Sequence, residues 1–136
     1  MIPRGIRNNN PLNIRIGNKW LGETSENTDG VFEQFTKMEY GVRAAFILIK
    51  RYINRYHLNT IPQIISRWAP RNENHTEKYI EYVCSFMAVS PTTKIAFEDK
   101  GMMLYLVHAM AIYECGQSIP LQVIRDGYKL ATLETS

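Results

Sequence analysis

The chain has 136 residues, of which 45% are hydrophobic and 21% charged, and its formal net charge is +3. This length and balance fit one globular domain with a real core, and they exclude a disordered or fibrous protein. Two cysteines exclude a disulfide framework, and the mild basicity favours an anionic partner only weakly.

Nothing in the sequence predicts a membrane span or a secretory leader. The longest apolar run, residues 102–112, is too short to cross a bilayer. The first ten residues lack the apolar stretch of a signal peptide, so we expect another system to deliver the protein if its target lies outside the cytoplasm. We therefore expect a single domain over residues 1–136.

Residues 1–35 are rich in Asn, Gly and Thr and contain only short apolar pieces. These pieces predict short strands of a small sheet at Leu12–Ile16, around Trp20, and at Val31–Phe35. The polar stretch over residues 22–30 predicts a loop between them.

Five helices are predicted after this segment. Thr36 and Glu39 form a capping-box pattern, and apolar residues at helical spacing then continue until an end near His57–Asn59. The other four are a short helix capped by Thr60 that stops at Pro70, a helix capped by Asn74 or Thr76 that ends before Ser90, a buried helix over residues 102–114, and a last helix over about residues 120–131. The order predicts an α+β protein that is mainly α, with a small N-terminal β element.

The helix over residues 102–114 carries the main functional prediction. It is apolar nearly all the way round, which predicts burial in the core, and it ends at Glu114 just before Gly116, which suits a helix C-terminus. An apolar setting and the negative end of the helix dipole both disfavour a charged carboxylate. A carboxyl that stays protonated near neutral pH can act as a general acid, as in glycosidic bond cleavage. The alternative is a Glu that faces water and has no chemical role.

Amides, aromatics and further acids add candidates for the same chemistry. The amides of Asn10 and Asn13 match sugar hydroxyls and acetamido groups because they donate and accept, although the run also suits an elaborate turn. Two tryptophans, Trp20 and Trp68, can stack on sugar rings or pack in the core. Acids in loop-like contexts, Asp29 and Glu73, can position a water as a second carboxylate or simply be solvated.

Several other function classes are not expected. The isolated histidines and cysteines have no metal-ligand spacing, so we expect no metal site. No Gly-rich phosphate loop or nucleophile motif is present, and we expect no cofactor. A clustered basic stripe with interleaved aromatics is also missing, which argues against nucleic acid as a partner.

Several sequence strings resemble a family of phage virion and prophage proteins, which are described as structural proteins or lytic enzymes. The strings are Arg4-Gly-Ile-Arg-Asn-Asn-Asn-Pro-Leu-Asn-Ile-Arg15, Trp20-Leu-Gly22, Asp29 with Phe32 to Phe35, Glu39-Tyr-Gly-Val-Arg-Ala44, Trp68-Ala-Pro70, Glu73-Asn74-His-Thr76 and Tyr79. The resemblance covers about residues 4–127. In that family a late helix ends in a His-Glu-Asn-Gly-like motif, where this chain has Tyr113-Glu114-Cys115-Gly116, so that the Glu and Gly match and the Tyr and Cys depart.

A more distant resemblance is to lysozyme-like peptidoglycan glucosaminidases and lytic transglycosylases. Their catalytic Glu lies on an Ala-x-x-x-Glu-Ser-Gly helix, followed by Asn-x-x-Gly-Ile-Lys and Trp-x-Gly segments and later by Ala-Thr-Asp-Pro-x-Tyr. Similar pieces occur here in rotated order, as Asn10–Arg15, Trp20–Gly22, Trp68–Tyr79 and Met110–Glu114. This resemblance implies a circularly permuted lysozyme-like domain whose chain ends lie near each other.

The two resemblances together imply cleavage of peptidoglycan glycan strands by Glu114, acting as acid and then as base. By resemblance, Tyr79 would stabilise charge near the reacting sugar, and the cleft would be lined by Asn10, Asn13, Trp20, Trp68 and Glu73. A second carboxylate, with Asp29 as the candidate, would give a hydrolysed sugar, whereas a single acid would give an anhydro product.

The resemblance also implies a location and partners. The protein would lie in a phage virion beside other virion proteins, or in the bacterial cytoplasm until another system delivers it to the cell wall. The alternative to an enzyme is a non-catalytic phage structural protein of the same fold that binds glycan, and the departures at Tyr113 and Cys115 favour it. We favour the enzyme.

Overall fold

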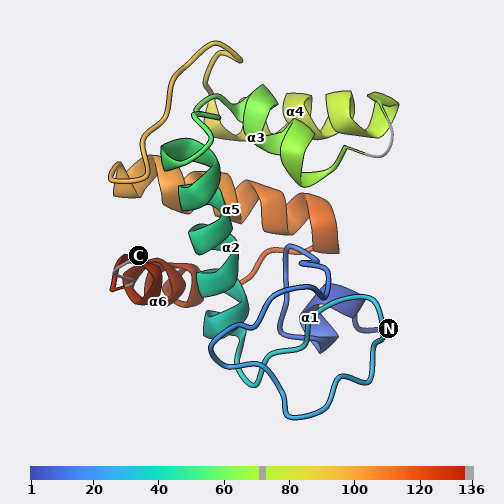
Figure 1. The fold of residues 1–136 in the computed structure, drawn as a ribbon. Helices are drawn as coiled ribbons and strands as arrows, with labels where there is room; N and C mark the ends of the chain where they lie inside the picture. Colours follow the sequence, from blue (N-terminus) through green and yellow to red (C-terminus); the bar gives the residue numbers. More distant parts are fainter. Residues whose placement is uncertain (71–72, 134–136) are drawn as a thin grey trace.

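A computed structural model describes residues 1–70 and 73–133, with side chains at residues 1–70 and 75–133. Within these ranges it contains six helices: α1 (Arg4–Arg7), α2 (Met38–Asn54), α3 (Ile61–Trp68), α4 (Glu73–Met87), α5 (Lys100–Cys115) and α6 (Leu121–Thr132). The helix α5 crosses the middle of the molecule, with α3 and α4 on one side of it and α6 and the N-terminal segment on the other (Figure 1).

The expected α+β class is wrong, because the described residues form helices and loops and no strand. The segments 12–16 and 31–35 do lie side by side, but they share only the bridge between Arg15 and Phe32, and another bridge joins Glu23 to Phe35. The chain cannot continue as a strand because Asn13 has a left-handed backbone with φ 53°. The predicted sheet is therefore replaced by loops around the short helix α1, which the sequence did not predict.

Asparagine side chains take the place of a sheet in this segment. The Asn10 amide is fully buried; its Nδ2 donates to the carbonyls of Ile14 and Glu33 at 2.9 and 3.0 Å, and its Oδ1 accepts from the Ile14 N–H at 3.0 Å. Because buried backbone groups must be paired, one side chain here satisfies three of them. The amide of Asn10 thus joins two stretches of loop that the sequence pattern assigned to strands.

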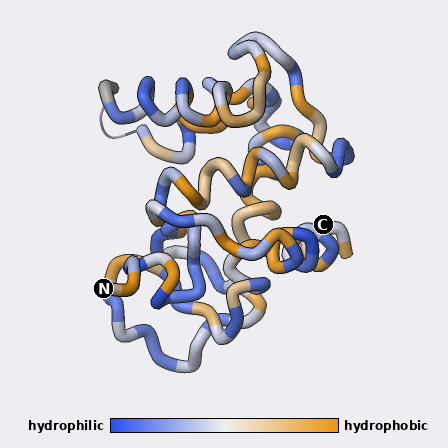
Figure 2. The backbone as a smooth tube through the Cα atoms, turned by 180° about the vertical axis from the view of Figure 1, so that it is seen from behind, coloured by the Kyte–Doolittle hydropathy of each residue, from blue (hydrophilic) through white to orange (hydrophobic). Residues whose placement is uncertain are grey.

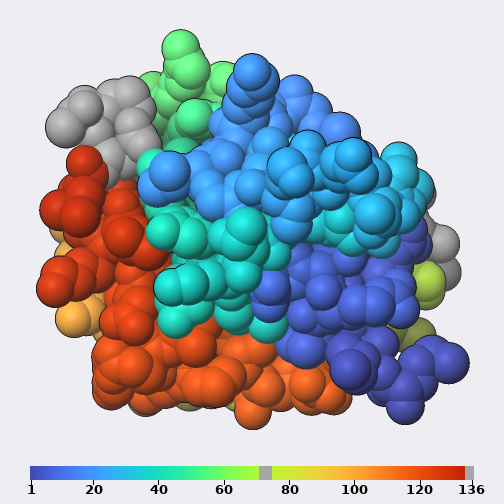
Figure 3. All heavy atoms as spheres, turned by 90° about the horizontal axis from the view of Figure 1, so that it is seen from below, coloured from blue at the N-terminus to red at the C-terminus, as the bar shows by residue number. Residues whose placement is uncertain are grey.

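The permuted arrangement requires the chain ends to lie close together. The N-terminus and α6 instead lie on opposite sides of α2 in Figure 1, and the view from below in Figure 3 separates them in the same way. Figure 3 also shows the N-terminal segment packed against the start of α2 and against the chain near the end of α5. The N-terminal segment therefore reaches the end of α5, while the N-terminus lies apart from α6.

Helix boundaries follow the predicted capping signals only in part. At α3 the capping box is present, since the Thr60 hydroxyl accepts from the Gln63 N–H and the Gln63 side chain accepts from the Thr60 N–H. At α2 the expected Thr36 cap is wrong, because the cap position is Lys37 and the Thr36 hydroxyl donates to the Gly22 carbonyl. The α2 helix also ends earlier than expected, at Asn54.

The predicted buried helix is confirmed as α5, which extends from Lys100 to Cys115. The Asp99 side chain caps its first turn, and Gly116 ends it in the left-handed conformation with φ 75°. Residues on every side of it are buried, namely Met103, Leu106, Val107, Ala109, Met110 and Ala111. Hydrophobic residues follow the central helices, whereas the outer loop of the N-terminal segment is mostly hydrophilic (Figure 2). Within the described residues, each helix is too short or too polar to cross a membrane.

One buried acid in the N-terminal segment gives a pH-dependent prediction. Burial, followed by the nearby charge of Glu23, raises the pKa of Glu33 to about 7 from the ordinary 4.5. The native state therefore keeps this proton up to about pH 7, whereas the unfolded state loses it near 4.5, so the stability that Glu33 contributes falls as the pH rises through this window. We therefore expect the unfolding free energy of Glu33→Gln, relative to that of wild type, to be higher at pH 8 than at pH 4.5. Urea unfolding at both pH values measures it. The exposed Glu26→Gln serves as the control, and equal differences at both pH values for Glu33→Gln contradict the prediction.

Candidate active site

The end of α5 meets the N-terminal segment, and this junction positions the candidate acid. Asn13 Nδ2 donates to Glu114 Oε1 at 3.1 Å, and the Cys115 thiol donates to the Pro11 carbonyl at 3.0 Å. Gly5 of α1 also packs here, where an added Cβ would lie 2.6 Å from Cys115 Sγ. Contacts between residues about a hundred positions apart thus hold Glu114 against the loop of residues 10–15.

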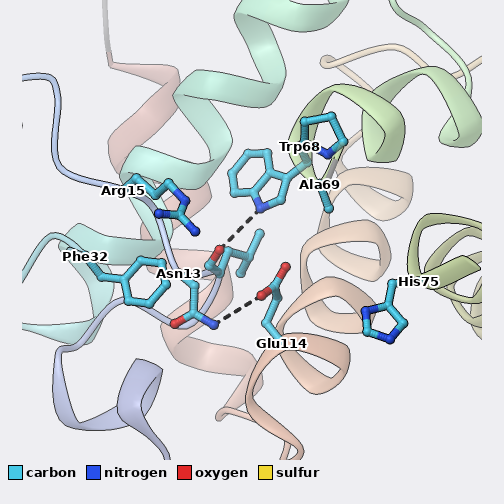
Figure 4. Close-up of a pocket in the computed structure, with 9 residues that line it drawn as sticks. Asn13, Arg15, Phe32, Trp68, Ala69, His75 and Glu114 are labelled. Atoms are coloured by element: carbon cyan, nitrogen blue, oxygen red, sulfur yellow. Dashed lines mark hydrogen bonds between the residues drawn. The ribbon is translucent and has the colours of Figure 1, made fainter. Parts of the chain in front are cut away.

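Glu114 opens into a pocket of about 460 Å³ between this loop and the end of α3. The carboxyl group lies between Asn13 and His75, with Trp68 above it in the view of Figure 4. The residues that line the pocket are Leu12, Asn13, Arg15, Phe32, Trp68, Ala69, Pro70, His75 and Glu114. A cavity of this size, with apolar walls and a few polar groups, suits part of a sugar chain or a ligand of similar size.

Burial raises the pKa of Glu114 above its ordinary 4.5, while the hydrogen bond from Asn13 and the interaction with Tyr79 act in the opposite direction. Desolvation is the largest of these effects because α5 is surrounded by core residues. The group is therefore both connected to a cavity and reluctant to ionise, which are the two properties that a general acid requires.

Tyr79 lies beside Glu114, as its predicted role requires. It is 2% exposed, and burial together with the neighbouring Glu114 raises its pKa well above 10. Its hydroxyl oxygen is buried and makes no well-formed hydrogen bond within the described part of the chain. A buried hydroxyl in this condition is a candidate donor to a ligand or to the carboxylate that forms when Glu114 gives up its proton.

The two residues that depart from the family motif have structural contacts. Tyr113 stacks on Tyr79, with ring centroids 4.1 Å apart and an interplanar angle of 22°. Cys115 is 8% exposed, and its thiol donates a hydrogen bond to the Pro11 carbonyl. Burial, followed by the nearby charge of Glu114, raises the pKa of this thiol to about 11. These contacts support the walls around Glu114 and keep Cys115 a neutral thiol.

Trp68 lines the pocket and also packs against neighbours. Its Nε1 donates to the Leu12 carbonyl at 3.2 Å, and its ring meets Tyr52 edge to face with centroids 6.0 Å apart. The hydrogen bond ties α3 to the N-terminal loop across the pocket, so Trp68 has a structural contact in addition to its place in the pocket wall.

Two other predicted site residues, Asn10 and Trp20, lie outside this pocket. The Asn10 side chain hydrogen bonds to backbone groups of Ile14 and Glu33. Trp20 packs against α2, where the Arg51 guanidinium lies 5.5 Å from the centroid of its ring. The side chain of Glu73, the first residue of α4, lies outside the described residues.

Asp29 has a structural environment away from the pocket. It accepts two hydrogen bonds from the Arg4 guanidinium at 2.7 Å each, one from Asn8 at 3.0 Å and others from the backbone N–H groups of Val31 and Phe32. These hydrogen bonds hold the pKa of Asp29 well below its usual range, and the bond from Arg4 has the largest effect. A carboxylate with this many partners organises the loop and is poorly placed to activate a water in the Glu114 pocket.

Sequence reasoning missed Arg15 and Phe32 as pocket residues. The Arg15 guanidinium lies 5.3 Å from the Phe32 ring centroid, so the two form one wall together. Both residues belong to the sequence strings that carry the family resemblance, Arg4–Arg15 and Phe32–Phe35, and this is the signal that could have identified them. Across the described residues, no three His, Cys, Asp or Glu side chains gather as metal ligands would.

Comparison with known proteins shows that the chain is similar in sequence to a phage protein. No protein-family model matches the sequence. The chain is 41% identical over 96 residues, or 68% of its length, to Protein P5 of Pseudoalteromonas phage PM2. The match spans 60% of the length of P5, so it compares part of that protein. The chain is thus a relative of a bacteriophage protein.

Proposed function

We propose that the pocket binds glycan strands of peptidoglycan and that Glu114 cleaves them as a single general acid and base. The observation that carries this proposal is the Glu114 carboxyl, which lies in a 460 Å³ pocket and whose pKa is raised by burial. Relationship to a phage protein supports a setting in which a bacterial cell wall is the barrier.

In the first step, the protonated Glu114 gives its proton to the glycosidic oxygen while the bond from that oxygen to C1 breaks. The Asn13 amide holds one carboxyl oxygen, and the Tyr79 hydroxyl lies beside the group as its charge develops. In the second step, the Glu114 carboxylate takes the proton of the sugar's 6-hydroxyl, whose oxygen bonds to C1. The product is a 1,6-anhydro sugar, and Glu114 is protonated again.

The single-acid route is favoured over hydrolysis by the position of the second candidate carboxylate. Glu114 is the one acid among the described residues that line the pocket, and Asp29 is held by Arg4 elsewhere. In the common two-carboxylate routes, hydrolysis needs a second carboxylate that either activates a water or attacks the sugar as a nucleophile. We therefore expect the anhydro product to predominate.

A non-catalytic phage structural protein that binds glycan is the second candidate. Tyr113 and Cys115 support it, because they replace polar groups that the resembling family has next to its Glu. In either case we propose a place in the phage particle beside other virion proteins, or delivery to the wall by another system.

Digestion of purified peptidoglycan sacculi separates these functions. The protein is incubated with sacculi, and the soluble fragments are identified by mass spectrometry before and after borohydride reduction. Anhydro ends, which resist reduction, support the single-acid enzyme, whereas reducible ends indicate hydrolysis. Binding to sacculi without any released fragment favours the structural protein and contradicts the enzyme.

A further inference from the structure

The Glu114 pocket contains a charged side chain that general acid catalysis does not use. Arg15 is the one lysine or arginine among the described residues that line the pocket. Its guanidinium forms no hydrogen bond or ion pair with any residue of the described ranges. Burial raises the pKa of Glu114, the one acid among the same lining residues, and so favours its neutral form. The donors of Arg15 are therefore available to a ligand.

Backbone contacts hold Arg15 in place. The preceding residue, Ile14, accepts a hydrogen bond from the Glu33 N–H at 2.9 Å. The following residue, Ile16, donates its N–H to the Val31 carbonyl at 3.0 Å. A side chain that extends from a backbone held on both sides loses less conformational entropy when it binds a ligand.

The Phe32 ring supports the guanidinium of Arg15, which lies 5.3 Å from the ring centroid. The Arg4 guanidinium also lies near this ring, 4.7 Å from its centroid, but it donates two hydrogen bonds of 2.7 Å to Asp29. Of these two arginines, Arg15 is the one that lines the pocket. The ring thus carries one arginine that is already occupied and one that faces the site of the proposed ligand.

The position of Arg15 relative to Glu114 suits recognition of a sugar substituent. In Figure 4, Arg15 lies on the side of the pocket opposite His75, with Asn13 and Glu114 between them in this view. A sugar whose glycosidic oxygen meets Glu114 can therefore turn a substituent towards the guanidinium.

The chemistry of a guanidinium favours one kind of substituent. It carries five N–H donors and no acceptor, so it cannot accept the proton of a sugar hydroxyl. A carboxylate accepts two parallel hydrogen bonds from the same guanidinium and has the opposite charge. N-acetylglucosamine has only hydroxyl and acetamido groups, whereas N-acetylmuramic acid has in addition a lactyl group that ends in a carboxyl. An arginine in the pocket therefore suits the second sugar.

We infer that Arg15 binds a carboxylate of the glycan strand, so that the pocket selects strands that contain N-acetylmuramic acid over uncharged strands of N-acetylglucosamine alone. The carboxylate belongs either to the lactyl group or to the peptide that is attached to it. This role of Arg15 rests on the proposed function, because it concerns the same substrate. Arg15 determines which strands bind, and Glu114 cleaves them.

The test is an NMR titration of the ¹⁵N-labelled wild-type protein at constant ionic strength. The probes are N-acetylglucosamine, N-acetylmuramic acid and N-acetylmuramoyl-L-alanyl-D-glutamate, which contain no glycosidic bond and are not consumed. We expect saturable shifts of the Arg15 Nε–H and Asn13 side-chain amide signals. One or both carboxylate ligands should bind about tenfold more tightly than N-acetylglucosamine, as one charge-assisted contact provides. The tighter of the two identifies the source of the carboxylate.

Variants locate the contact. Arg15→Gln should lower the affinity for the carboxylate ligands to that for N-acetylglucosamine and leave the latter unchanged, which loss of a merely structural contact would not do. Arg15→Lys keeps the charge without the planar fork and should retain part of the preference. The matched control is Arg7→Gln, which removes the same charge from an exposed residue of α1 outside the described lining of the pocket and should leave all three affinities unchanged.

Several results would overturn this role of Arg15. They are equal wild-type affinities for the three sugars, no saturable shift with any of them, an equal loss of preference in Arg7→Gln, or a parallel loss of N-acetylglucosamine affinity in Arg15→Gln. Digestion of sacculi is scored separately. A protein that gives one of these results and still releases fragments keeps the proposed cleavage, whereas one that prefers the carboxylate ligands and releases none keeps the role of Arg15 and loses the enzyme.

Discussion

Substituting Gln for Glu114 is expected to lower the rate of sacculus digestion about 10³-fold, since general acid catalysis contributes between 10² and 10⁴. Gln has the shape of Glu and keeps an oxygen that can accept from Asn13 Nδ2, so the pocket should stay intact. What it lacks is a proton for the glycosidic oxygen. The release of soluble fragments per unit time, measured for both proteins at the same concentration, gives the ratio.

The control for this substitution is Glu77→Gln, which removes the same charge from an exposed position on α4. We expect its digestion rate to match wild type, and near-UV circular dichroism should show native packing in both variants. Because burial disfavours the Glu114 carboxylate, Glu114→Gln should be as stable as wild type or more so at pH 7. A well-folded Glu114→Gln protein that digests sacculi at the wild-type rate removes Glu114 from the mechanism.

Introducing Ala at Gly41 is expected to destabilise the protein by about 3 kcal/mol, at the upper end for overpacking a core. A Cβ at this position would overlap the carbonyl oxygen of Asn9 and come within 3.2 Å of the Asn10 Cα. Both are backbone atoms of a segment that hydrogen bonds hold in place, so they cannot move aside cheaply. Urea unfolding monitored by circular dichroism measures the loss.

Gly101→Ala is the matched control, because it is also a helical glycine but has open space. The nearest contact to a Cβ there is Asp99 Oδ1 at 3.8 Å, so the substitution should raise stability by up to about 1 kcal/mol through helix propensity. Gly41→Ala should also weaken the Glu114 site, since the same segment carries Asn13 to the carboxyl. Equal unfolding free energies for Gly41→Ala and wild type would show that the N-terminal segment does not depend on close contact with α2.

The sequence was a good guide wherever local chemistry decides the structure. The helix α5 was predicted because its apolar run has no glycine after residue 101 and ends at Gly116, which has φ 75° in the structure. The Thr60 cap of α3 was predicted for the same kind of reason, since its partner Gln63 is three residues away. Placing an acid at the end of α5 then required only the sequence.

The N-terminal segment could not be predicted in this way, because contacts between distant residues decide it. Its order comes from Asn10, which bonds to Glu33 twenty-three residues later, and from Asp29, which bonds to Arg4 twenty-five residues earlier. Short apolar pieces between such groups look like strands, but these side chains satisfy the backbone groups that a sheet would pair. The same contacts keep Asn10 and Asp29 from the roles in the pocket that their residue types suggested.

The central claim is that the Glu114 carboxyl holds its proton above the pH at which an ordinary Glu loses it. The most direct test is a ¹³C NMR titration of the side-chain carboxyl carbons of wild-type protein, with the Glu114 signal assigned by its loss in Glu114→Gln. The account predicts a Glu114 midpoint clearly above 4.5, with digestion falling as the pH rises through that midpoint. A midpoint at or below 4.5 would mean that the group is ionised at neutral pH, and it would contradict the role of Glu114 as the acid.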